Sequence, residues 1–203
     1  IIISDIRTTD EAEYYKVVEE FNDNDSLYPS DKTVHELFSE VALKYPTSTA
    51  VIFENNSITY KELDIRSNQL ANLLREQYGV LPNSFVAIIS DPSIELIIGI
   101  LAILKCGCAY VPIDKDYPQQ RIDYIIKDSG VSVVLADYDL LVSDNIKLVH
   151  IDDVSIINEA SEDSILVEIS SVASAYMIYT SGTTGGPKGT IVGHQGPVRL
   201  VRN

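Results

Sequence analysis

The spacing of apolar positions predicts two helices in the first part of the chain. Each predicted helix begins with a capping box, in which a threonine is followed three residues later by a glutamate: Thr33 with Glu36, and Thr59 with Glu62. Apolar residues recur at helical spacing after each box, and the stop signals Pro46 and Gly79 follow the two periodic segments.

From residue 85 onward, short apolar segments with strand character alternate with helical patterns. Strands are expected at 85–89, 109–111, 131–135, 146–151 and 175–180, and helices at 94–105 and 119–128. Repetition of strand, helix and strand is typical of a parallel sheet covered by helices. The helix at 94–105 is nearly all apolar, which suits a position between two layers. We therefore expect an α/β fold, a parallel-rich sheet with helices on both faces, preceded by a hairpin at 50–53 and 57–59.

Composition and charge narrow the class of protein. The chain has 203 residues, 45% of them hydrophobic, which is enough for one domain with a sizeable core. The formal net charge of −15 argues against nucleic acid as a partner. Acidic residues are frequent in 1–30 and in 152–168, and we expect the second segment to be a solvated connection. Residues 170–203 contain no Asp or Glu and carry Lys188, Arg199 and Arg202, which favours an anionic ligand there.

The cysteines and the apolar runs exclude other kinds of site. Cys106 and Cys108 are one residue apart, a spacing that matches neither zinc nor redox motifs, so we expect two small buried thiols and no metal site. The longest apolar run, 94–104, is well below the ~20 residues that span a bilayer. No membrane partner is expected, and we expect a cytoplasmic protein.

The most informative segment lies between Tyr179 and Gly189 and has the sequence Tyr-Thr-Ser-Gly-Thr-Thr-Gly-Gly-Pro-Lys-Gly. Its glycines allow successive backbone N–H groups to point at an anion, its hydroxyls add neutral donors, and its lysine adds a positive charge. The spacing fits neither a Walker A loop nor a dinucleotide fingerprint. We predict a phosphate-binding loop, in preference to a flexible linker, formed by Thr180, Ser181, Gly182, Thr183, Thr184, Gly185, Lys188 and Gly189.

We assign no catalytic residue from the sequence. His194 follows the loop, but a lone histidine is more often structural than catalytic. Tyr110 and Asp114 follow the apolar helix, and we expect them to pack and to cap a turn.

The loop resembles the signature loop of adenylate-forming enzymes, and more specifically that of the adenylation domain of nonribosomal peptide synthetases. Residues 58–63, Ile-Thr-Tyr-Lys-Glu-Leu, resemble the first core motif of that family, and residues 104–114 resemble the second. The family's usual Tyr-Pro and Arg-Ile pairs follow at 117–118 and 121–122. The sequence departs from the family pattern at Cys106, Cys108, Lys115 and Thr190, where the family usually has Ala, Gly, Pro and Val.

The resemblance implies a domain organisation and an activity. Residues 1–30 would be an acidic linker after a condensation domain, and 31–203 the amino-terminal part of an adenylation domain, truncated after the phosphate loop. The family uses ATP with Mg2+ to convert an amino acid to its aminoacyl-adenylate, with release of pyrophosphate. The product is loaded onto a phosphopantetheine thiol of a downstream carrier domain outside this chain. The implied partners are the rest of the adenylation domain, the condensation and carrier domains, the amino-acid substrate and a small helper protein.

Other interpretations remain open at this stage. The chain could belong to an acyl-CoA or aryl-acid ligase, or it could be a non-catalytic docking module of a megasynthase. Residues 1–30 could be an ordinary flexible amino terminus. By itself the 203-residue chain is expected to be inactive, because in the family the residues that bind the acid, the adenine and the magnesium come later.

Overall fold

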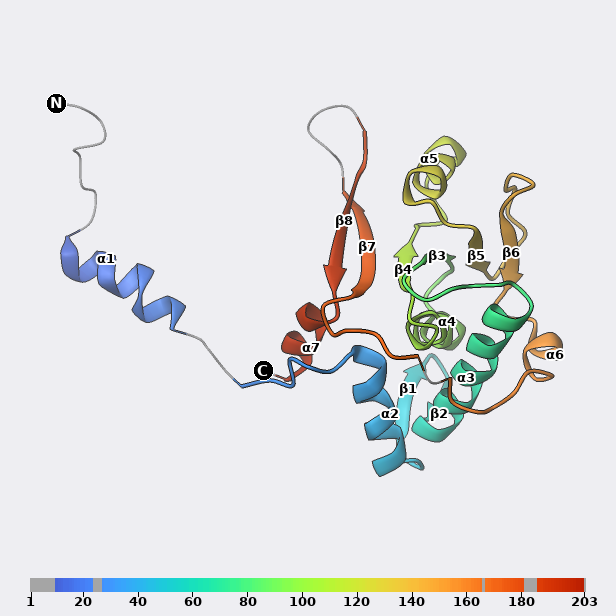
Figure 1. Cartoon of the computed structure of the whole chain (residues 1–203), viewed down its shortest axis with the longest axis horizontal. Coiled ribbons are helices and arrows are strands. Elements are labelled where there is room, and N and C mark those ends of the chain that lie inside the picture. The colour runs from blue at the N-terminus through green and yellow to red at the C-terminus, as the bar shows by residue number, and fades with distance from the viewer. Residues whose placement is uncertain (1–9, 24–26, 166, 181–185, 203) are drawn as a thin grey trace.

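The centre of the structure is a six-stranded sheet with the strand order β6-β5-β3-β4-β7-β8 (Figure 1). The computed structural model describes residues 10–23, 27–165, 167–180 and 186–202. Strands β6, β5, β3, β4 and β7 pair in parallel, β8 runs antiparallel to β7, and β1 and β2 form a separate hairpin. The strands are β1 Thr49–Phe53, β2 Asn56–Thr59, β3 Phe85–Ile89, β4 Ala109–Pro112, β5 Val133–Ala136, β6 Lys147–His150, β7 Ser174–Thr180 and β8 Lys188–Gly193.

Helices cover both faces of this sheet, which confirms the expected α/β architecture (Figure 1). Helices α3 and α4 lie on one face and α5 lies on the other. In the described part of the chain, no helix combines the length and the apolar character needed to cross a bilayer. The helices are α1 Glu11–Val18, the short 3-10 helix η2 Glu20–Asn22, α2 Val34–Lys44, α3 Tyr60–Glu76, α4 Ile94–Lys105, α5 Gln119–Ser129, α6 Val154–Ile157 and α7 Gln195–Arg202.

Both predicted capping boxes are present. At the start of α2, the Thr33 hydroxyl accepts from the backbone N–H of Glu36, whose carboxylate accepts from the Thr33 N–H at 2.7 Å. The same reciprocal pair joins Thr59 and Glu62 at the start of α3. Each box satisfies helix N–H groups that have no partner within the helix, and thereby fixes the first residue of the helix.

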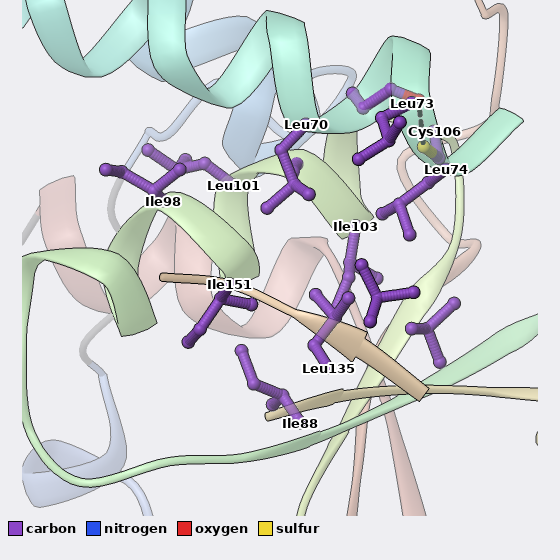
Figure 2. Close-up of a cluster of buried hydrophobic side chains, with 14 of the residues drawn as sticks. Leu70, Leu73, Leu74, Ile88, Ile98, Leu101, Ile103, Cys106, Leu135 and Ile151 are labelled. Carbon is purple, nitrogen blue, oxygen red and sulfur yellow. Dashed lines mark hydrogen bonds between the residues drawn. The ribbon is translucent and has the colours of Figure 1, made fainter. Parts of the chain in front are cut away.

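Helix α4 lies between the sheet and α3, as its apolar sequence predicts (Figure 2). Gly99 allows α4 to lie close against the sheet, because a Cβ there would lie 2.8 Å from Cδ1 of Ile88. Cys106 and Cys108 are buried free thiols, as expected, and Cys106 Sγ donates to the Ala71 carbonyl of α3. Burial raises the pKa of Cys106, so this thiol stays protonated. Figure 2 labels the residues at the centre of this layer: Leu70, Leu73, Leu74, Ile88, Ile98, Leu101, Ile103, Cys106, Leu135 and Ile151.

A buried lysine joins α4 to α3. Lys105 is 4% exposed, and its Nζ donates to Asp64 Oδ1 at 2.8 Å, Ser67 Oγ at 2.8 Å and Asn68 Oδ1 at 2.6 Å. Its ammonium also lies 5.4 Å from the centre of the Phe38 ring of α2. Burial lowers the pKa of Lys105, and the Asp64 carboxylate opposes that shift. The lysine of the second motif is therefore structural here: it links three helices.

Helix α5 covers the opposite face of the sheet with Ile122, Ile125 and Ile126. These side chains pack against alternate residues of the strands, which point to this face because side chains in a strand alternate with a period of two. The strand residues on this face are Ala87, Ile89, Val111, Val134, Met177 and Tyr179.

The acidic connection at 152–168 is more ordered than the sequence indicated. It contains the short helix α6, and the buried Ile157 joins the core. Asn72 of α3 donates to the carbonyls of Ser161 and Asp163 at 2.8 and 2.9 Å. The expectation of a solvated connection was incomplete, because the exposed acids of this segment are interleaved with apolar residues that pack inward.

Besides η2 and α6, three larger elements were absent from the expectation: α1, β8 and α7. Helix α1 begins where the Asp10 side chain accepts from the Glu13 N–H, and none of its residues is buried, so it lacks a core pattern. Strand β8 and helix α7 follow the predicted loop. Strand β8 is mostly exposed and contains two glycines, so it lacks the alternation of a half-buried strand. Helix α7 carries Gly196 and Pro197 in its first turn, two residues that disfavour a helix interior.

Two buried histidines connect the beginning of α2 to the beginning of α7. The rings of His35 and His194 are 5.5 Å apart and cross at 72°. The backbone N–H of Val34 donates to His194 Nδ1 at 3.3 Å, so this nitrogen must be unprotonated. Burial lowers the pKa of both histidines to about 4, and the charge of His194 further lowers that of His35. These contacts give His194 a place in the packing between α2 and α7.

Replacing Lys105 tests the link between the helices. Lys105→Ala should lower the free energy of unfolding by about 3 kcal/mol, because it removes one partner of a largely buried ion pair and leaves Ser67 and Asn68 without their donor. Lys105→Met should cost less, since the side chain still fills the space. Urea unfolding measures both. Lys61→Ala, at an exposed position of α3, should change stability by less than about 0.5 kcal/mol, and an equal loss in Lys61→Ala and Lys105→Ala would contradict the assignment.

The histidine pair predicts a pH dependence of stability. Between the ordinary pKa of 6.5 and the folded pKa of about 4, the unfolded chain binds protons that folded His35 and His194 do not. The free energy of unfolding should therefore fall as the pH falls through this window, by at most about 1.4 kcal/mol per pH unit for each histidine. His194→Asn keeps an acceptor for Val34 without a titrating group, so its urea unfolding at pH 7 and pH 5 should show a smaller difference. His150→Asn, at a half-exposed site, serves as the control. An unchanged pH slope in His194→Asn would refute the prediction.

Candidate functional site

The predicted phosphate-binding segment connects the two strands of a hairpin. Thr180 ends β7 and Lys188 begins β8, and the two residues are directly paired in the antiparallel register. Thr180, Lys188 and Gly189 are all exposed. The remaining predicted site residues, Ser181, Gly182, Thr183, Thr184 and Gly185, lie outside the described residues, so their role stays a prediction.

Gly189 has a packing function that the sequence did not indicate. It pairs with Tyr179 across the hairpin, and a Cβ at this position would lie 2.7 Å from Met177 Sδ and 3.0 Å from Tyr179 Cζ. A side chain here would displace the Tyr179 ring, which is 7% exposed and belongs to the core between the sheet and α5. The glycine thus leaves room for the Met177 and Tyr179 side chains of β7 beside β8.

Helix α5 bonds to the hairpin in β7 and at the residue before β8, close to the predicted site. The Tyr124 hydroxyl donates to the carbonyl of Pro187 at 3.1 Å. The Tyr179 hydroxyl donates to Asp128 Oδ2 at 2.7 Å. Tyr124 and Asp128 are four residues apart and therefore lie on the same side of the helix. Sequence reasoning missed both residues, since the only local signal was two polar groups on one side of an amphipathic helix.

The Tyr179 hydroxyl is held as a neutral donor. Burial raises the pKa of Tyr179, and the hydrogen bond to Asp128 and the charge of that carboxylate raise it further. Ionisation would place two negative charges in contact, so the phenol keeps its proton throughout the physiological pH range.

The positive charge around the hairpin is more local than the sequence indicated. Lys188 lies at the end of the hairpin that meets residues 181–185, whereas Arg199 and Arg202 belong to α7 at the opposite end of β8 (Figure 1). A strand advances about 3.3 Å per residue, so β8 separates the two ends by more than the ~8 Å over which exposed charges interact at physiological salt. The three bases therefore do not gather at one end of the hairpin, and of the three Lys188 alone lies next to the predicted loop.

Acidic residues lie at the carboxyl ends of β3, β4 and β5. Their carboxylates form hydrogen bonds and an ion pair with nearby residues. The Ser90 hydroxyl and the Asp91 N–H both donate to Asp137 Oδ2, and Lys115 pairs with Asp91. Within the described residues, no group of three or more His, Cys, Asp or Glu is arranged to hold a metal ion. The described donor set does not fit a Mg2+ site, so no chemical step is assigned to a metal here.

The second motif serves packing, as expected. The Tyr110 ring lies 5.5 Å from that of Tyr176 on the neighbouring strand β7. Asp114 accepts from the backbone N–H of Asp116 at 2.9 Å and so caps the turn after β4. Both residues support the strands near the hairpin.

Hollows of the described surface lie away from the predicted phosphate site. A groove of about 770 Å³ separates α5 from residues 141–146, and its lining includes Gln119, Asp123 and Lys127. A second, largely apolar hollow of about 340 Å³ lies between α2, α4 and the start of α7. Neither is lined by Thr180, Lys188 or Gly189, which lie exposed at the end of the hairpin.

Comparison with known proteins agrees with this geometry. The family described as "AMP-binding enzyme" matches residues 38–203. Bacitracin synthase 3 of Bacillus licheniformis is 42% identical over 199 residues, which cover 98% of this chain and 3% of that protein. Gramicidin S synthase 2 of Brevibacillus brevis is 42% identical over 201 residues, covering 98% of this chain and 4% of that protein.

Solved structures show the same fold. The nonribosomal peptide synthetase FmoA3 superposes with a TM-score of 0.82 at 29% identity, over 90% of this chain and 19% of that chain. The N-terminal subdomain of Klebsiella oxytoca NpsA, in complex with anthranilyl-AMSN, superposes with a TM-score of 0.74 at 28% identity, over 84% of this chain and 43% of that chain.

The chain thus spans a small fraction of the peptide synthetases that it matches. The family match covers most of the chain, and the similarity to peptide synthetases extends over nearly all of it. Together with the matching fold, these findings confirm the resemblance carried by the three motifs: the chain belongs to the AMP-binding enzyme family and corresponds to the amino-terminal part of an adenylation domain of nonribosomal peptide synthetases.

Proposed function

We propose that this chain supplies the phosphate-binding part of an enzyme that activates an amino acid with ATP. The reaction forms an aminoacyl-adenylate and pyrophosphate, and the aminoacyl group then passes to the phosphopantetheine thiol of a carrier domain. The observation that carries the proposal is the hairpin in which Thr180 and Lys188 face each other at the two ends of the predicted loop. The similarity to peptide synthetases supports it.

In the adenylation reaction, the protein contributes mainly by positioning the reactants and by stabilising negative charge. A carboxylate oxygen of the amino acid attacks the α-phosphorus of ATP, and the bond from that phosphorus to the bridging oxygen breaks as pyrophosphate leaves with the electron pair. Negative charge on the departing phosphates needs donors that are already in place. The Lys188 ammonium, the Thr180 hydroxyl and the donors of residues 181–185 would supply them.

An amino acid is the preferred substrate class. The two similar synthases at 42% identity are named for the peptides bacitracin and gramicidin S. An aryl acid is the second candidate, because the NpsA subdomain was solved with anthranilyl-AMSN at 28% identity to this chain. Pyrophosphate exchange with a panel of amino, aryl and fatty acids distinguishes these classes and the acyl-CoA ligase. Exchange with none of them would favour the non-catalytic docking module.

The proposed surroundings follow from the same similarity. Residues 1–30 would link a preceding condensation domain to the adenylation domain at 31–203, and the fully exposed α1 is compatible with a linker. The remainder of the adenylation domain, a carrier domain and a small helper protein complete the proposed partners. A cytoplasmic location is part of the same proposal.

Substitutions in the loop test the phosphate role directly. In the full-length protein, Lys188→Ala and Thr183→Ala should each lower kcat/KM for ATP by about 10- to 100-fold, because each removes a donor to a charged phosphate oxygen. ATP–pyrophosphate exchange at varied ATP and saturating amino acid measures the effect.

Two exposed positions provide matched controls. Lys61→Ala on α3 and Thr190→Ala on β8 make the same chemical changes away from the predicted donors, and each should alter kcat/KM by less than about twofold. If Lys188→Ala and Thr183→Ala behaved like these controls, the predicted phosphate-binding site would be wrong.

A further inference from the structure

Helix α5 holds the hairpin at two points, one in β7 and one at the residue just before β8. Tyr124 donates to the carbonyl of Pro187, the residue immediately before Lys188. Asp128 accepts from Tyr179, the residue immediately before Thr180. We propose that Tyr124 and Asp128 are positioning residues that hold Lys188 and Thr180 in place for the phosphates of ATP. This inference rests on the proposed function of the hairpin.

The bond from Tyr124 acts on the peptide that joins Pro187 to Lys188. The carbonyl of Pro187 and the N–H of Lys188 belong to one planar peptide group. Fixing the direction of the carbonyl therefore also fixes the orientation of the Lys188 backbone N–H. The proline ring restricts φ at residue 187 and leaves few other torsions free there. The contact is direct and lies at the surface, since Tyr124 is 41% exposed.

The bond from Tyr179 acts on the other strand. The Tyr179 ring is buried between Gly189 and α5, and its hydroxyl ends on a charged acceptor, which makes a stronger hydrogen bond than a neutral one. Asp128 lies in the last turn of α5, where the helix dipole disfavours an acid. The hydrogen bond from Tyr179 offsets the unfavourable interaction of Asp128 with the helix dipole.

Helix α5 is a suitable anchor for both bonds. Ile122 and Ile125 fix it in the core against the sheet, with exposures of 3% and 0%. A site supported by side chains from a packed helix keeps its geometry better than one that depends on its own loop. The two contacts therefore transmit the rigidity of the core to the exposed end of the hairpin.

Kinetics of the full-length protein test the proposal. Tyr124→Phe and Asp128→Ala should each raise the KM for ATP by about three- to tenfold and leave the KM for the amino acid within about twofold. Asp128→Asn should recover most of the loss, because its amide oxygen can still accept from Tyr179. Tyr14→Phe and Asp123→Ala make the same changes as Tyr124→Phe and Asp128→Ala at exposed positions of α1 and α5, and should have less than about a twofold effect. If both KM values rise together with a loss of stability, or if neither changes, the positioning role is refuted.

Hydrogen exchange gives a readout that does not depend on catalysis. In the same full-length protein without ligand, Tyr124→Phe and Asp128→Ala should speed exchange of the amides at 176–180 and 188–192, while β3 and β5 exchange as before. If wild type shows no acid-dependent pyrophosphate exchange, the proposed function fails, and faster hairpin exchange in the variants would still support the link to α5. If the wild type is active but the hairpin amides of both variants exchange as in the wild type, the positioning role is overturned while the proposed function stands.

Discussion

The structure depends on the burial of α4, a helix that is apolar on nearly every side. Such a helix is stable in water only if both of its sides are covered. The sheet covers one side and α3 covers the other, and Gly99 allows α4 to approach the sheet closely. Lys105, at the end of α4, is buried because Asp64, Ser67 and Asn68 of α3 bind its ammonium. The residues of the second motif are thus explained by the contacts of this layer.

The two faces of the sheet have different relations to the candidate site. The α4 face fixes the parallel strands and has no described contact with the end of the hairpin. The α5 face packs on the same strands and also bonds to the residues next to Thr180 and Lys188. A change in the α4 layer should therefore alter stability first, whereas a polar change on α5 can alter the hairpin while the core remains packed.

Sequence reasoning succeeded where a local signal determines the structure. The capping boxes at Thr33 and Thr59 gave the first residues of α2 and α3, and continuous runs of apolar residues gave α4 and β3. It failed for β8, whose exposed residues carry no alternation that a core would impose. The contacts of Tyr124 and Asp128 join residues 63 and 51 positions apart, and no local pattern reports a contact at that distance. The loop itself was recognised from its composition, but its register as a hairpin depends on tertiary pairing.

The position of Asp128 raises the question of how an acid can lie so close to a proposed phosphate site. Its carboxylate accepts from the Tyr179 hydroxyl, so a neutral donor lies between the acid and the hairpin. Because Tyr179 keeps its proton, the acid contributes rigidity to β7 without an added charge on the strand itself. Lys188 lies at the exposed end, where anions have access, and Arg199 is too far along the chain to share that role. A net charge of −15 is compatible with the proposed anion site, because the Asp128 carboxylate is bonded to Tyr179 and Lys188 is exposed.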